Sequence, residues 1–181
     1  MSVLVTGGMG FIGSHTVVEL LNSGEDVIIV DNLSNSKKET LDAIKKITNK
    51  VPKFYNVDIR NKELLDNVFK DNKDINAVIH FAALKAVGES VEKPIEYYDI
   101  NIWGTIALLD VMRNNNVKKI IFSSSATVYG SPKTVPIKED FPKSATNPYG
   151  QTKVMVEQIL NDVYTSDNEW SIILLRYFNP I

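Results

Sequence analysis

The chain has 181 residues, which is enough for one domain of ordinary size with a substantial core. Apolar residues make up 44% and charged residues 23%, a balance typical of a soluble globular protein. The net charge of −2 gives no electrostatic case for binding nucleic acid or an anionic membrane, and the lack of cysteine excludes disulfides, thiolate metal sites and thiol catalysis.

Short β-rich runs alternate with longer helical patterns along the chain. Runs such as VIIV at 27–30 and IIFSS at 120–124 are continuously apolar, which is typical of strands covered on both faces. In chain order, the pattern predicts strands at 3–6, 27–30, 54–57, 77–81, 119–123 and 171–176, with helices near 11–23, 37–48, 61–71, 95–114 and 149–165. This alternation predicts an α/β fold, a Rossmann-like doubly wound parallel sheet with helices on both faces.

Three further features concern the organisation of the chain. The segment from Gly130 to Pro148 contains four prolines and is predicted to be a long loop, of the kind that is often functional. The sequence stops directly after a predicted core strand, so we expect residues 1–181 to be one domain cut from a longer protein. The first residues have no basic segment and no run approaches ~18 apolar residues, so we expect neither a signal peptide nor a membrane span, and a cytoplasmic location.

A glycine-rich stretch joins the first predicted strand to the first predicted helix. Gly7, Gly10 and Gly13 satisfy G-x-x-G-x-x-G, and Gly8 with the last two satisfies G-x-G-x-x-G. A tight turn and a close backbone approach to a pyrophosphate leave no space for side chains, and the helix N-terminus then presents free N–H groups to the anion. The position of the motif between strand and helix predicts a dinucleotide-binding turn.

Two aspartates follow the next two predicted strands. Asp31 ends the second strand, where a carboxylate can bind a ribose 2′-hydroxyl and repel a 2′-phosphate, which favours NAD over NADP. Asp58 follows the third strand, where it either bonds the adenine edge or caps the helix that begins near Asn61. The local sequence does not decide between these two roles.

Tyr149 and Lys153 lie four residues apart at the start of the last predicted helix, and therefore share one face of it. A lysine so placed would lower the pKa of the tyrosine, which could then exchange a proton with a substrate hydroxyl. Removal of a hydride from an alcohol carbon requires loss of that proton. On its own, however, the spacing is more typical of an ordinary helix surface.

A run of hydroxyl residues follows the fifth predicted strand. Ser123, Ser124, Ser125 and Thr127 lie where the strand ends, and ligands of open parallel sheets bind beyond the carboxyl ends of the strands. One hydroxyl could therefore bridge a substrate oxygen and the phenol of Tyr149. The alternative is a serine-rich strand exit whose hydroxyls bond their own backbone.

These features together resemble the extended short-chain dehydrogenase/reductase superfamily and, within it, the UDP-glucose 4-epimerase family. The resemblance covers all 181 residues. It is carried by LVTGGMGFIGSHT at 4–16, DNLSNSK at 31–37, HFAALKAVGESVEKPIEYY at 80–98, FSSSATVYG at 122–130, PYGQTKVMVEQIL at 148–160 and LLRYFNP at 174–180.

The resemblance implies an enzyme that holds NAD tightly and transiently oxidises the sugar at C4, so that UDP-glucose and UDP-galactose interconvert. Tyr149 would be the catalytic base, Lys153 would hold the nicotinamide ribose and tune Tyr149, and Ser125 would be the catalytic serine. Substrate contacts would come from Lys85, Ser125, Thr127, Tyr149 and Asn179. The family commonly forms homodimers through two helices of each subunit, which here are the helices near 95–114 and 149–165.

The resemblance implies cofactor positions along the carboxyl edge of the predicted sheet. They are Gly7, Gly10, Phe11, Ile12, Gly13, Asp31, Asn32, Leu33, Ser34, Asn35, Ser36, Asp58, Ile59, Phe81, Ala82, Ala83, Leu84, Lys85, Tyr149, Lys153 and Phe178. Asn101 is expected to fix its helix against the site rather than touch substrate. No metal ligand is expected.

Two departures and two alternatives accompany this resemblance. Ala83 replaces a glycine that is common in the family, and family members are roughly twice as long, with a C-terminal portion that carries most substrate contacts. Related 4,6-dehydratases carry Asp-Glu beside the threonine after the fifth strand, whereas this chain has Ala126 and Val128 around Thr127. Decarboxylases and sugar reductases of the same superfamily belong with this first alternative, and the second is a dinucleotide-binding fragment without catalysis.

Overall fold

A computed structural model describes residues 1–179, and its centre is one six-stranded, fully parallel sheet. The strand order is β3-β2-β1-β4-β5-β6. The strands are β1 (Ser2–Thr6), β2 (Asp26–Asp31), β3 (Lys53–Asn56), β4 (Ile75–His80), β5 (Lys119–Ser125) and β6 (Ser171–Tyr177). The predicted fold class is confirmed, and the order reverses between β1 and β4, which is where such sheets bind ligands.

Seven α-helices and two short helical turns lie within the described residues. The α-helices are α1 (Phe11–Asn22), α2 (Glu39–Thr48), α3 (Lys62–Asp71), α4 (Val87–Glu92), α5 (Pro94–Tyr98), α6 (Gly104–Asn114) and α7 (Pro148–Ser166). The turns are a π-helical segment η1 (Asp99–Trp103) and a 3₁₀ turn η2 (Ala126–Tyr129). The sequence did not predict α4, and the single helix expected at 95–114 is interrupted by η1.

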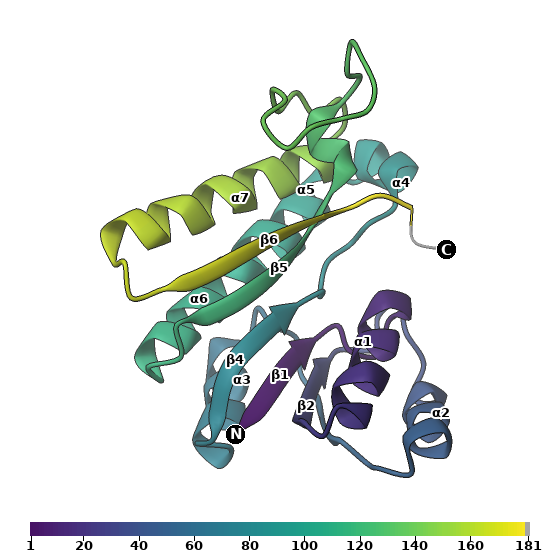
Figure 1. Ribbon diagram of the computed structural model, residues 1–181, viewed down its shortest axis with the longest axis vertical. Coiled ribbons are helices and arrows are strands. Elements are labelled where there is room, and N and C mark those ends of the chain that lie inside the picture. Colours follow the sequence, from purple (N-terminus) through teal and green to yellow (C-terminus); the bar gives the residue numbers. More distant parts are fainter. Residues whose placement is uncertain (180–181) are drawn as a thin grey trace.

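Helices cover the two faces of the sheet unequally. Val17, Leu21 and Ile44 from α1 and α2 pack with β1 and β2 in one apolar cluster, while α3, α6 and α7 pack on the other face in a larger one. Figure 1 shows α1 and α2 at the end of the sheet formed by β1 and β2, with α7 running beside β5 and β6. Ile173 and Leu175 of β6 remain 49% and 39% exposed, so the described residues cover this part of the sheet only in part.

Apolar residues on α5, η1, α6 and α7 contribute to both core and surface. Leu109 and Val156 are buried, and Ile102, Ile159 and Val163 pack against the larger cluster. Ile95, in contrast, is 79% exposed, and Ile106 is also exposed. Among the described residues, no helix is both long and apolar enough to cross a membrane.

Candidate functional site

The glycine turn is shaped by close contacts that forbid side chains. Gly7 has a φ of +68°, and a Cβ there would lie 2.6 Å from the backbone nitrogen of Ala82. A Cβ at Gly13 would collide with the carbonyl oxygen of Gly7, so this glycine lets α1 lie directly on the turn. Gly8 faces the core, where a Cβ would meet Ile29, and it does not line the cavity. The glycines of the motif that line the cavity are therefore Gly7, Gly10 and Gly13.

Helix α1 begins at Phe11 and points its N-terminus into this turn. Gly10 supplies no side-chain cap, and the first turn of α1 carries no acidic residue, so neither competes with an anion there. The N–H groups of Phe11 and Ile12 belong to the first turn, whose donors have no partner within an α-helix. This cradle fits the pyrophosphate of a dinucleotide.

Asp31 is a structural support of the same turn as well as a candidate ribose ligand. Its carboxylate is 8% exposed and accepts hydrogen bonds from the backbone N–H groups of Met9 at 3.0 Å and Leu33 at 2.9 Å. The hydroxyl of Ser36 donates to it at 2.8 Å. The sequence predicted a cofactor role for Asp31 and offered the capping of a loop as the alternative, but it did not predict the contacts with Met9 and Ser36, which depend on the folded turn.

Leu33 is the one predicted cofactor residue that does not line the cavity. Its φ is +57°, and its side chain packs against the smaller apolar cluster. Its contribution to the turn is the backbone N–H that Asp31 accepts. Its neighbours Asn32, Ser34, Asn35 and Ser36 do line the cavity.

Asp58 does not cap α3 with its side chain. Asn61 is the N-cap residue, and its Oδ1 accepts from the N–H of Leu64 at 3.1 Å. The Asp58 carboxylate instead binds Arg60 through two side-chain hydrogen bonds of 2.9 and 2.7 Å, and Asn32 donates to it at 3.1 Å. The hydrogen bonds from Arg60 lower the pKa of Asp58 to about 2, so the cavity wall beside Asn32 keeps its negative charge at neutral pH.

The segment after β4 carries Lys85 and is fastened by Asn101. Asn101 is 3% exposed and accepts from the N–H of Leu84 at 2.8 Å, while its Nδ2 donates to the Leu84 carbonyl and to Thr152 Oγ1, each at 3.0 Å. The expectation that Asn101 fixes its helix against the site is consistent with these contacts. The buried amide joins the π-helical segment, the Lys85 loop and α7.

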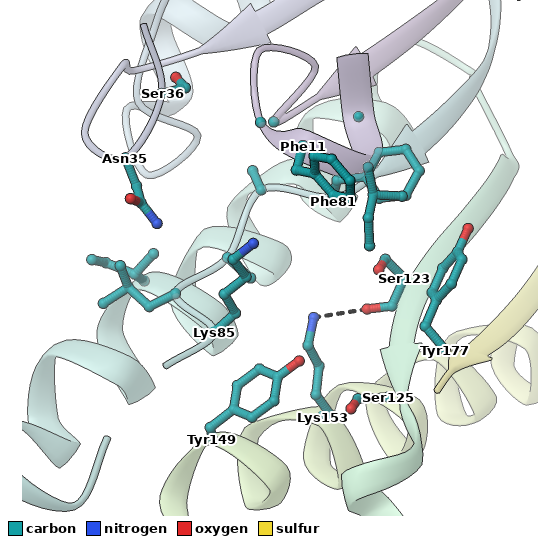
Figure 2. Close-up of a pocket in the computed structure, with 18 of the residues that line it drawn as sticks. Phe11, Asn35, Ser36, Phe81, Lys85, Ser123, Ser125, Tyr149, Lys153 and Tyr177 are labelled. Carbon is teal, nitrogen blue, oxygen red and sulfur yellow. Dashed lines mark hydrogen bonds between the residues drawn. The ribbon is translucent and has the colours of Figure 1, made fainter. Parts of the chain in front are cut away.

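Tyr149, Lys153 and Ser125 meet at the other end of the cavity (Figure 2). Asn147 caps α7 by accepting from the N–H of Gly150 at 2.8 Å, and Pro148 takes the first helical position. Gly150 lies against the backbone of Thr127, where a Cβ would come within 3.1 Å of the Thr127 carbonyl. The N-terminus of α7 therefore sits tightly on the turn that follows β5.

The hydroxyls at the end of β5 form their own short network. Ser125 Oγ accepts from Thr127 Oγ1 at 2.9 Å and from the Thr127 N–H at 3.2 Å. Both expectations for this strand exit therefore describe part of it: Ser125 bonds its neighbouring backbone, and it also lines the cavity beside Tyr149.

Lys153 is buried, at 4% exposure, and its Nζ donates to the Ser123 carbonyl at 2.7 Å. Burial lowers the pKa of Lys153 to about 7, and the carboxylate of Glu157 opposes that shift. Burial also raises the pKa of Tyr149, and the neighbouring Ser125 hydroxyl offsets part of the rise. The sequence-based expectation of a lowered Tyr149 pKa is therefore wrong for this structure, because desolvation of the phenol dominates.

One cavity of about 560 Å³ brings these residues together. It is lined by every predicted cofactor, catalytic and substrate residue except Leu33, including Ile59, Phe81, Ala83, Phe178 and Asn179. It also includes Ser123 and Ser124 of the hydroxyl run, and six residues that the sequence did not single out: Val30, Val57, Val87, Ile100, Ala126 and Tyr177. Among these residues, Tyr177 makes an aromatic contact with a predicted cofactor residue: the centroids of its ring and of the Phe81 ring are 6.4 Å apart. Its position at the end of β6, next to Phe178, is the feature of the sequence that could have indicated that it lines the cavity.

The described residues contain no group of three histidine, aspartate or glutamate side chains arranged to hold a metal ion. A parallel sheet with a glycine turn at its switch point, an acidic residue ending β2 and a Ser-Tyr-Lys group instead defines a Rossmann-type dinucleotide-binding domain of the extended short-chain dehydrogenase/reductase class.

Comparison with known proteins narrows this class. A family model described as GDP-mannose 4,6 dehydratase matches residues 4–180, and the chain belongs to this family. It is 62% identical over 180 residues to UDP-glucose 4-epimerase of Bacillus subtilis and 58% identical over 179 residues to that of Dictyostelium discoideum, with 99% of this chain covered in each case. The crystal structure of UDP-glucose 4-epimerase from Bifidobacterium longum in complex with NAD+ and UDP matches with a TM-score of 0.97 and 58% identity, over 100% of this chain and 54% of that one.

The chain spans about half the length of these relatives, 53% of the Bacillus and 52% of the Dictyostelium protein. It aligns with the N-terminal, NAD-binding portion of UDP-glucose 4-epimerases.

Proposed function

We propose that this chain is the cofactor-binding and catalytic half of an enzyme that interconverts UDP-glucose and UDP-galactose in galactose metabolism. The observation that carries the proposal is the shared cavity, which joins a pyrophosphate cradle at Gly7–Gly13 to the Ser125, Tyr149 and Lys153 group. NAD, when bound there, supplies the acceptor for the hydride of the sugar carbon. The relatives that match at 62% and 58% identity are UDP-glucose 4-epimerases.

The roles of the chain's own residues follow from their surroundings. Tyr149 is the base that takes the proton of the sugar 4-hydroxyl, and Ser125 Oγ, fixed by Thr127, positions that hydroxyl. The ammonium of Lys153 orients the nicotinamide ribose. A bound cofactor that carries positive charge on its nicotinamide would favour the phenolate of Tyr149 and so counteract the effect of burial on its pKa.

The remaining cofactor contacts are part of the same proposal. When NAD is bound, Asp31 would hold the adenosine ribose, and Asp58 with Ile59 would contact the adenine. Lys85, from the loop that Asn101 fastens, would bind the ribose and diphosphate, and Phe178 would contact the cofactor as well. Thr127 and Asn179 face the UDP-sugar, most of whose contacts we assign to the rest of the parent protein.

A dehydratase activity is the competing proposal, because the matching family model is described by that reaction. A dehydratase must eliminate water from the sugar, and that step needs an acid beside the reacting carbon. The residues around Thr127 are Ser125, Ala126 and Val128, with no carboxylate among them. This stretch favours epimerisation.

The deciding experiment uses the full-length parent protein, incubated separately with UDP-galactose and with GDP-mannose and followed by chromatography of the products. Epimerisation gives UDP-glucose with no change in mass, whereas dehydration gives a product lighter by one water. Tyr149→Phe should lower kcat by about 10²–10⁴-fold if the phenol is the base. Unchanged turnover in that variant would contradict the assignment, and a chain that binds NAD without turnover in the full-length protein would support a binding module.

Assembly and location complete the proposal. We propose a homodimer that packs α5, α6 and α7 of the two subunits together, since Ile95, Trp103 and Ile106 on this side are 79%, 45% and 38% exposed. A cytoplasmic location is in keeping with the family resemblance. Sedimentation of the full-length protein tests the dimer, and Ile95→Glu should convert a dimer of this kind to monomers.

A further inference from the structure

Glu157 is a fully buried carboxylate with ionic partners from two other segments of the chain. Its exposure is 0%. Arg176 on β6 donates to it through Nε and Nη2, each at 2.9 Å, and Lys143 of the long loop donates at 2.7 Å. Ser124 on β5 donates through its hydroxyl. A carboxylate buried in this way is costly unless it is fully paired, so its retention beside a candidate active site calls for an explanation.

The position of Glu157 on α7 relates it directly to the site. Tyr149, Lys153 and Glu157 follow one another at four-residue intervals, so their side chains share one helix face. Two of them line the cavity, and Glu157 lies one turn deeper, beneath Lys153. The mechanism proposed above gives Glu157 no role.

We propose that Glu157 is a positioning residue of this site: its carboxylate holds the ends of β5 and β6 against α7 and is the counter-charge of the Lys153 ammonium. The proposal rests on the proposed function only for the kinetic part of its test.

The first half of the role is geometric. Ser124 stands between Ser123, whose carbonyl accepts from Lys153, and Ser125, which lies beside Tyr149. Arg176 precedes the cavity residue Tyr177 and also donates to the Tyr129 hydroxyl and to the carbonyl of Glu139 in the long loop. Both strand ends that carry site residues are therefore fixed to the helix by a single carboxylate.

The second half is electrostatic. The titratable groups that face Lys153 are Tyr149 and Glu157 on its own helix and His80 on β4, while Ser123 on β5 offers a carbonyl. His80 is buried between Thr6 and Thr105, and burial lowers its pKa to about 3, so it is neutral. Glu157 is the one of these three that is negatively charged at neutral pH.

The charge of Glu157 is secured by its own partners. Burial alone would raise the pKa of Glu157, but hydrogen bonds from Arg176, Lys143 and Ser124 outweigh it, and the pKa lies below its ordinary value. With a neutral residue at 157, Lys153 would lose the negative charge that lies one helical turn away, while the cations of Arg176 and Lys143 would remain. Its ammonium would then lose its proton at lower pH.

The test uses the full-length protein with isotope-labelled lysine, so that NMR follows the titration of Lys153 without substrate. Glu157→Gln keeps the shape and removes the charge, and should lower the pKa of Lys153 by about one unit or more. Lys143→Met removes one of the neighbouring cations and should shift the same pKa upward. Asp110→Asn is the matched control, because Asp110 also pairs with two cations, Lys62 and Arg113, and lies on α6.

Kinetics with UDP-galactose supply a second measurement. The alkaline limb of the kcat profile should move to lower pH in Glu157→Gln and to higher pH in Lys143→Met, with KM changed by less than about twofold. If the role of Glu157 were purely structural, both variants would lose activity, and the alkaline limbs of their kcat profiles would not move in opposite directions. The proposal is overturned if the Lys153 titration is unmoved in Glu157→Gln, if the two variants shift it in the same direction, or if Asp110→Asn shifts it equally.

The two measurements separate this inference from the proposed function. The titration of Glu157→Gln is interpreted only if its NMR spectrum shows that the variant folds. Lys143→Met changes an exposed residue, so this variant tests the electrostatic role in any case. If the wild-type protein does not convert UDP-galactose, the proposed function fails, while the lysine titration still decides whether Glu157 is the counter-charge.

Discussion

At the residue scale, the candidate site contains ionisable side chains whose charged forms are costly to bury. Lys153 has 4% exposure and a pKa of about 7, against an ordinary value of ~10.4. Tyr149 is raised in pKa by the same desolvation. Both shifts favour the uncharged form of each side chain, because burial removes the water that would solvate the charge.

Lys153→Met should therefore stabilise the cofactor-free protein while abolishing turnover. Between pH 7 and ~10 the unfolded chain binds more protons at this lysine than the folded chain, so the free energy of unfolding of the wild type rises with pH across that window. The variant lacks this rise. Denaturant unfolding at several pH values checks this, and the gain from the variant should be largest at pH 7 and shrink toward pH 10, even after the loss of the hydrogen bond to Ser123.

Asp31→Asn tests whether this residue supports the turn as well as the cofactor. Two backbone N–H groups donate to the carboxylate, and an amide would direct its own N–H₂ at one of them. The expected cost is about 1–3 kcal/mol in the free energy of unfolding, together with weaker NAD binding and a smaller preference for NAD over NADP. Calorimetric titration with both dinucleotides measures the preference, and a variant with full stability would show that the carboxylate acts on the cofactor alone.

At the element scale, each site residue is placed by the end of a strand or the start of a helix. The sequence predicted all six strands and the helices α1, α2, α3 and α7, because their hydrophobic patterns are long and their caps, such as Asn147-Pro148, are recognisable. It missed α4, whose six residues are too short to show a helical period, and the π-helical turn at Asp99–Trp103, which depends on how Asn101 is bonded. The raised pKa of Tyr149 was missed because burial belongs to the fold rather than to a four-residue spacing.

The contact between α1 and the glycine turn supplies a matched pair of substitutions. Gly13→Ala would place a methyl group against the Gly7 carbonyl, so it should destabilise the protein and weaken NAD binding by an order of magnitude or more, about 1.4 kcal/mol or above. Gly88→Ala, in α4, meets open space and should be neutral or stabilising by up to about 1 kcal/mol. Thermal unfolding and NAD titration of both variants check this, and equal effects would refute the steric argument.

At the scale of the whole molecule, the sheet order explains how distant segments form one cavity. The turn after β1, the loop after β4 and the end of β5 meet because β1 and β4 are neighbours at the switch point of the parallel sheet. All three lie within this chain, and Asn179 lines the same cavity. Of the predicted site residues that line it, more belong to the cofactor positions than to the substrate positions.

This asymmetry predicts how the 181-residue chain responds to ligands. NAD at 100 times its dissociation constant should raise the free energy of unfolding by about 2.7 kcal/mol, since the ligand binds the folded state alone. UDP at the same concentration should shift the thermal midpoint of the full-length parent but have little effect on this chain, because the proposed function assigns most nucleotide-sugar contacts to the rest of the parent protein. Thermal melts of both proteins with NAD, NADP and UDP test this, with Gly13→Ala as the variant in which the NAD response should be smaller. A UDP shift equal in the two proteins would place the substrate site within residues 1–179 and require Thr127, Lys85 and Asn179 to bind UDP-sugar unaided.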